Sequence, residues 1–166
     1  MKKKTVKITI KTQISDLGAV NIMEKVSGPE MNESLLPEDE IIEYSTEAVL
    51  YDHGEAFELS YDESTDMGMK DTHTTIVFSK SEPDCVNLKR EGENRTSLFF
   101  SPDHPRQNCA YNSGGYTFEF VTVTRKVVNT VTEKGGNIEI DYTMEVFGTK
   151  TQRNRIFIKV DEIKNN

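Results

Sequence analysis

Hydrophobic and polar residues alternate along most of this chain, a pattern typical of β-strands with one face in water. Residues 5–14 begin the alternation, with Val6, Ile8 and Ile10 separated by threonine and lysine. Residues 138–146 carry its most regular stretch, in which apolar and polar side chains take turns without a break. The pattern predicts about eight to nine short strands and no long helix.

Turn residues separate these strands at short intervals. Asp52-His53-Gly54 joins two alternating runs, as in a hairpin, and Lys134-Gly135-Gly136-Asn137 is a second strong turn signal. Residues 102–115 hold two prolines and a glycine pair, so we expect loops around one short strand near residues 108–112. A sandwich or a barrel fits such a series, but a meander of neighbouring strands and the need to remove edges favour the barrel. We therefore predict an all-β fold, a closed antiparallel meander β-barrel.

Residues 15–40 depart from the pattern. They hold two glycines, two prolines and seven acidic residues with one lysine. Leu17, Val20, Met23 and Val26 have the spacing of a short helix, but a long acidic loop is the preferred interpretation. We predict one domain over residues 1–166, with residues 15–40 as a mobile, solvated insertion in preference to a lid over the barrel.

Charge and composition narrow the class of protein. The net charge is −8, and an acidic body makes nucleic acid a poor partner. The Lys2–Lys4 run indicates a solubilising tail, and strand alternation follows it where a signal peptide would have an apolar segment. No stretch is apolar enough to span a membrane as a helix. We expect a cytoplasmic protein in which Cys85 and Cys109 are reduced thiols.

The sequence shows no recognisable catalytic or metal-binding motif. The acidic run Asp62–Gly68 resembles a calcium loop but has Met67 where glycine is required, so a solvated turn is the preferred interpretation. The three histidines lie in separate segments, and only a convergence of His104 and Cys109 with another ligand would give a zinc site. No nucleophile elbow or phosphate-binding glycine loop occurs. We predict no catalytic residues, no metal and no cofactor.

In each strand, the alternate positions that are mostly apolar also include a few polar side chains. These polar side chains therefore lie on the apolar face of the strand. If that face lines the barrel interior, tyrosines and an arginine would surround an apolar space that suits an amphipathic, anionic ligand. The alternative is that the hydroxyl groups bond to one another and that the arginine reaches solvent at a strand end. The candidate ligand-binding residues are Tyr44, Tyr61, Arg90, Thr124, Tyr142 and Asn154.

Several short stretches along the strands are familiar: Thr46-Glu47-Ala48, Leu59-Ser60-Tyr61-Asp62-Glu63, Thr122-Val123-Thr124-Arg125, Gly136-Asn137-Ile138-Glu139-Ile140-Asp141-Tyr142 and Arg153-Asn154. Together they resemble the YwiB-like family of uncharacterised bacterial proteins, which carry a domain of unknown function. The resemblance covers roughly residues 4–160, and the chain is longer than the shorter members at residues 15–40 and around 92–108. It implies a calycin-like, lipocalin-shaped barrel of about eight strands in a cytoplasmic protein, and it carries over no catalytic residues.

Three functions remain open on these grounds. The leading hypothesis is a cytoplasmic module that binds a small apolar or amphipathic molecule, acting as a monomer or weak homodimer without nucleic acid or membrane partners. The second is a structural or protein-interaction barrel with a filled interior and no ligand. An enzyme ranks third, because no nucleophile, base or metal set is legible.

Overall fold

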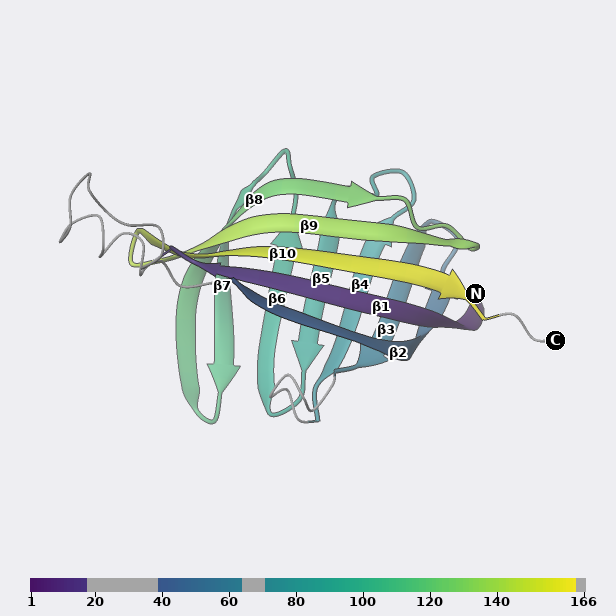
Figure 1. Ribbon diagram of the computed structural model, residues 1–166, viewed down its shortest axis with the longest axis horizontal. Helices are drawn as coiled ribbons and strands as arrows, with labels where there is room; N and C mark the ends of the chain where they lie inside the picture. The colour runs from purple at the N-terminus through teal and green to yellow at the C-terminus, as the bar shows by residue number, and fades with distance from the viewer. Residues whose placement is uncertain (18–38, 64–70, 164–166) are drawn as a thin grey trace.

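Ten strands form one closed antiparallel barrel within residues 1–17, 39–63 and 71–163, the parts of the chain that the computed structural model describes (Figure 1). Each strand pairs with the next along the chain, and β10 pairs with β1. The predicted closed meander is confirmed, with ten strands in place of eight to nine. The strands are β1 (Lys2–Asp16), β2 (Glu40–Asp52), β3 (Ala56–Asp62), β4 (His73–Ser79), β5 (Val86–Glu91), β6 (Asn94–Phe100), β7 (Arg106–Ser113), β8 (Tyr116–Asn129), β9 (Gly135–Val146) and β10 (Thr149–Glu162).

Several strands are longer than the sequence pattern predicts. Lys2–Lys4, expected to be a tail, begins β1 and pairs with the end of β2. Part of the loop expected at residues 102–115 is β7, which pairs along its whole length with β8. Strand β8 continues past a bulge between Thr124 and Lys126, and beyond it Val127 is buried. Pairing with neighbours therefore extends strands beyond the limits that local residue preferences set.

The segment between β1 and β2 is shorter at both ends than the acidic insertion predicted at residues 15–40. Strand β1 runs to Asp16 and β2 begins at Glu40. Residues 18–38 lie outside the described residues, so the choice between a solvated insertion and a lid remains a prediction, as does the short helix from Leu17 to Val26.

The β7–β8 hairpin shows how local sequence directs the meander. Gly114 and Gly115 separate Ser113 from Tyr116 and have φ angles of +52° and +91°. Two central residues with positive φ make the type of turn whose twist matches that of paired strands, and glycine adopts it without steric cost. The glycine pair therefore forces β8 to return beside β7.

Side chains on the inner face of β3–β6 form rows across the barrel, because directly paired residues point to the same side of a sheet. The rows nearest the start of β1 are apolar and fully buried. These two lower rows are Phe57, Phe78, Val86 and Phe100, and then Leu59, Ile76, Leu88 and Leu98.

The next row toward the opposite end of the barrel, here called the upper row, is mostly polar. It continues over β7 and β8, so that it extends around six of the ten described strands. Polar side chains are thereby gathered at the barrel end where β5 turns into β6 and β7 turns into β8. The upper row consists of Tyr61, Thr74, Arg90, Thr96, Tyr111 and Phe118.

Two interfaces in the barrel have short ladders. Strands β2 and β3 pair only from Val49 to Asp52 of β2, whereas the whole upper half of β2 pairs with β1 alone. Strands β6 and β7 pair only over Asn94–Thr96 of β6. In Figure 1, β1, β9 and β10 run lengthwise in front of β4–β6, which cross behind them. The β6–β7 ladder lies at the upper row, whereas the β2–β3 ladder lies at the lower rows and leaves these two strands unpaired beside the upper row.

An ion pair on the outer face joins β9 to β10. Arg153 donates two hydrogen bonds to the Asp141 carboxylate, at 3.0 and 2.7 Å. Arg125 lies 4.0 Å from the same carboxylate. The hydrogen bonds from Arg153 hold the pKa of Asp141 below its usual value, and the positive charges of the arginines add to this. No helix among the described residues is long and apolar enough to cross a membrane.

Candidate functional site

A buried carboxylate lies where β3 ends. The Glu63 side chain is only 2% exposed and accepts hydrogen bonds from the Tyr44 hydroxyl and from Thr74 Oγ1, the latter at 2.6 Å. The Glu63 backbone N–H donates to Thr72 O at 2.8 Å, which fixes the carboxylate beside the upper row. A buried carboxylate is costly unless it is hydrogen-bonded and paired with a cation, and both conditions are met here.

Tyr44 and Tyr61 remain neutral beside this carboxylate. Burial raises the pKa of Tyr44 far above its ordinary value, and its hydrogen bond to Glu63 and the Glu63 charge raise it further. Burial, and then the charge of Glu63, likewise raise the pKa of Tyr61. Both phenols therefore act as hydrogen-bond donors at neutral pH, and a second negative charge does not develop beside Glu63.

Arg90 is the cation of this cluster. Its Nε lies 3.8 Å from Glu63 Oε1, too far for a hydrogen bond, and its side chain is 23% exposed. Arg90 Nε is a buried atom without a hydrogen-bond partner among the described residues. A buried donor normally has a partner, so the described residues leave the hydrogen bonds of Arg90 incomplete at this atom.

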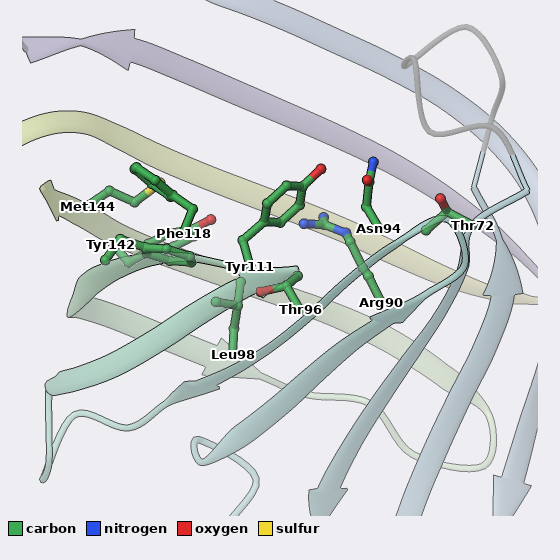
Figure 2. Close-up of a pocket in the computed structure, with 10 residues that line it drawn as sticks. Thr72, Arg90, Asn94, Thr96, Leu98, Tyr111, Phe118, Tyr142 and Met144 are labelled. Carbon is green, nitrogen blue, oxygen red and sulfur yellow. The ribbon is translucent and has the colours of Figure 1, made fainter. Parts of the chain in front are cut away.

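A cavity of about 300 Å³ lies on the other side of Arg90. Four members of the upper row form part of its wall, and residues of β8 and β9 form the opposite part (Figure 2). The volume is at the lower end of the range for small-molecule sites. The lining residues are Thr72, Arg90, Asn94, Thr96, Leu98, Tyr111, Phe118, Phe120, Tyr142 and Met144.

The cavity has a polar side and an apolar side. In Figure 2 the Arg90 guanidinium extends between Tyr111 and Asn94, whereas Tyr142 and Met144 lie on the opposite side. Burial raises the pKa of Tyr142, so its phenol is also neutral. A ligand with an anionic group and a short apolar part would match this division, since a guanidinium binds a carboxylate through two parallel hydrogen bonds.

The structure divides the six candidate residues predicted from the sequence. Arg90 and Tyr142 line the cavity, whereas Tyr44 and Tyr61 contact Glu63. Thr124 and Asn154 flank Tyr142 on the inner wall as its direct partners in β8 and β10, but they do not line the cavity. Thr124 Oγ1 and Asn154 Nδ2 are buried without a hydrogen-bond partner in the described part of the chain.

Sequence reasoning missed Glu63 and much of the cavity wall. Asp62–Gly68 was expected to form a solvated turn, and for Glu63 that expectation is wrong; residues 64–70 lie outside the described residues. The available signal was parity, because Glu63 continues the inward series of Phe57, Leu59 and Tyr61. Tyr111 lies in the short strand expected near residues 108–112, but it was missed because no inward parity was assigned to that strand.

The described residues contain no group of three histidine, cysteine, aspartate or glutamate side chains placed to hold a metal ion. Cys85 and Cys109 are free thiols, and burial raises the pKa of Cys109. The cavity and the cluster beside it offer hydrogen bonds, a positive charge and apolar contact.

Comparison with known proteins gives a family and a fold. A family model described as "Domain of unknown function (DUF1934)" matches residues 30–158. The crystal structure of the ywiB protein from Bacillus subtilis is similar, with a TM-score of 0.72 and 20% sequence identity over 98% of this chain and 94% of that chain. No curated protein matches the chain. At this identity the similar structure shows the fold alone.

Proposed function

The chain belongs to the DUF1934 family of domains of unknown function, and we propose that it is a binding module that holds a small amphipathic anion in its barrel. The observation that carries the proposal is Arg90, whose Nε is buried without a hydrogen-bond partner in the described residues and whose side chain forms the polar side of a cavity of about 300 Å³. A carboxylate at Arg90 would use this donor capacity.

The apolar side of the cavity supports the second half of the proposal. Leu98, Phe120 and Met144 offer contact to a short hydrocarbon part, and the neutral phenol of Tyr142 adds one hydrogen-bonding group. The proposal keeps the expectations that the protein acts in the cytoplasm and as a monomer or weak homodimer. A calycin-like binding mode, with one ligand held in the barrel, is part of the same proposal.

The alternative, a barrel with a filled interior that serves only as an interaction protein, has less support. The lower rows are filled with apolar side chains, but the barrel end at the upper row is not. Phe147, which is 99% exposed, and Tyr116 are exposed aromatic residues at two separate turns. Phe118 is also exposed on the same face of β8 as Tyr116, but it lines the cavity, and two neighbouring aromatics do not make the continuous apolar patch that marks a protein interface.

The test is a calorimetric titration with three probes of equal chain length: octanoate, octan-1-ol and octylamine. We expect octanoate to bind most tightly and Arg90→Met to weaken octanoate about tenfold or more while changing octan-1-ol little. Arg95→Met is the matched control, since Arg95 is an exposed residue of neighbouring β6. Native mass spectrometry of protein purified from its own cells would show whether a ligand is retained. If octanoate does not saturate, or binds equally to the Arg90→Met variant, an anion site at Arg90 is ruled out.

A further inference from the structure

Three side chains on the outer face of β3 and β4 are hydrogen-bonded in series. Ser60 Oγ lies 2.5 Å from His73 Nε2, and His73 Nδ1 lies 2.8 Å from Asp62 Oδ1. With Nδ1–H donating to Asp62, Nε2 accepts the Ser60 hydroxyl proton. A nucleophile, a base and an acid that orients the base thus stand in the order that activates a serine.

Strand pairing explains this arrangement. Asp62 is the direct partner of His73, and Ser60 is the direct partner of Thr75. Residues two apart in a strand share a face, so the imidazole of His73 can contact Asp62 across the ladder and Ser60 on the diagonal. The series lies on the face of β3–β4 opposite to Tyr61 and Thr74 and is separate from the cavity at Arg90.

Ser60 has one hydrogen-bond donor and one apolar residue as direct partners, Thr75 on β4 and Val49 on β2. Thr75 is directly opposite Ser60, and Lys89 of β5 is directly opposite Thr75. Directly paired side chains have Cβ atoms about 5 Å apart, so the Thr75 hydroxyl is within reach of an oxygen bound at Ser60. A developing oxyanion on the β4 side of Ser60 would therefore find the Thr75 hydroxyl within reach.

We propose that Ser60 is a nucleophile activated by His73 and that it accepts an acyl group from small activated carboxylic esters. Ser60 Oγ forms a bond to the ester carbonyl carbon while His73 Nε2 takes the hydroxyl proton. The carbonyl carbon then releases the alcohol or phenol, which receives that proton from His73. Water, deprotonated by the same nitrogen, releases the acid and restores Ser60.

Exposure sets the expected rate and range of substrates. The Asp62 side chain is 90% exposed and that of His73 is 46% exposed, so water weakens the interactions that a buried triad would use. Neither Ser60 nor His73 lines the cavity at Arg90 or any of three other surface cavities, which lie beside Lys3, Pro83 and Ala110. We therefore expect slow acylation by small aryl esters with little selectivity for the acyl group.

The experiment uses p-nitrophenyl acetate as the probe and follows the full-length protein by mass spectrometry. We expect one acetyl group on Ser60, located by peptide mapping, and release of p-nitrophenol above the buffer rate. Ser60→Ala should remove the adduct, and His73→Ala should slow acylation about tenfold or more, with added imidazole restoring part of it. Ser97→Ala is the control, because Ser97 is an exposed serine on the outer face of β6.

Two results would overturn the proposal. One is the absence of a Ser60 adduct in folded protein, as judged by circular dichroism. The other is a Ser60 adduct that forms at the same rate in His73→Ala, since a hydrogen bond that only stabilises the sheet predicts no effect on acylation. Neither result bears on octanoate binding, because Ser60, Asp62 and His73 lie on the outer face of β3 and β4 and none of them lines the cavity at Arg90.

Discussion

Tyr44 of β2 donates a hydrogen bond to Glu63, which follows the last residue of β3, across the part of the barrel where these two strands no longer pair. The backbone ladder between them ends at Val49 and Ser60. Above that point a side-chain bond joins the strands. The same carboxylate faces Arg90, which lines the cavity. Glu63 therefore joins β3 to β2 and is also the ion-pair partner of Arg90.

Removal of the Tyr44 hydroxyl tests this closure. Tyr44→Phe leaves Glu63 with one donor fewer, and we expect the free energy of unfolding to fall by about 1–3 kcal/mol. Urea denaturation at neutral pH measures it. Tyr51→Phe on the same strand is the control, since Tyr51 stacks on His53 through its ring, and we expect a change within about 0.5 kcal/mol. Equal losses in the two variants would mean that the Tyr44–Glu63 bond adds no specific stability.

The charge of Glu63 should oppose binding of an anion at Arg90. Glu63→Gln removes that charge while its amide oxygen can still accept from Thr74 or Tyr44. If the cavity binds octanoate, we expect Glu63→Gln to raise the affinity for octanoate about tenfold and to leave the affinity for octan-1-ol unchanged. Calorimetric titration of both probes measures the difference. Weaker octanoate binding in Glu63→Gln would instead show that the main role of Glu63, as ion-pair partner, is to position Arg90 for the anion.

The Asp141–Arg153 pair predicts acid sensitivity. The pKa of Asp141 is lower in the folded protein than in the unfolded chain, so the unfolded state binds the proton more readily. The stabilisation is present above the ordinary aspartate pKa of about 4 and is lost as the pH falls through the lower, folded value. We expect Asp141→Asn to reduce stability at pH 7 by about 1–3 kcal/mol and by less at low pH. Urea denaturation of Asp141→Asn and of Asp161→Asn, a control on β10, checks this.

The β8–β9 turn should not tolerate a side chain at Gly135. Gly135 has a φ of +108°, and a Cβ there would lie 2.4 Å from Val160 O. Gly115 has a φ of +91° and nothing within 4 Å of such a Cβ. We expect Gly115→Ala to cost about 1–2 kcal/mol and Gly135→Ala clearly more, because β10 must also move. Thermal unfolding of the two variants gives the comparison, and equal melting temperatures would count against a close approach of β10.

Much of the fold could be predicted because most strands bury one face. Alternation identified the inward side of β1, β3 and β9, and turn residues indicated a meander. What local pattern could not give was the length of β7 and β8, because pairing with a neighbour adds hydrogen bonds that no single segment reveals. The bulge between Thr124 and Lys126 likewise changes the inward parity without a clear sequence signal.

Alternation predicts which side chains of the candidate site point inward, but it does not predict how far along the barrel axis each one lies. Tyr44, Tyr61, Arg90 and Tyr142 all point inward or toward the cluster at Glu63, as alternation suggested. Parity does not show which inward residues share a level, and that depends on strand register. Thr124 and Asn154 share the level of Tyr142 as its direct partners and still lie outside the cavity, so neither parity nor level separates them from the cavity residues. Glu63 was assigned to a turn because the alternation was not followed beyond Asp62.

The short ladder between β6 and β7 has a consequence for how the barrel opens to solvent. It covers only Asn94–Thr96 of β6, and the wall of the cavity includes that same stretch and Tyr111 opposite it. Fluctuations that expose backbone amides begin where fewest hydrogen bonds must break, so native-state hydrogen exchange should be faster here than in β1 or β10. Local opening of the β6–β7 ladder would let a small molecule reach the cavity through the side of the barrel.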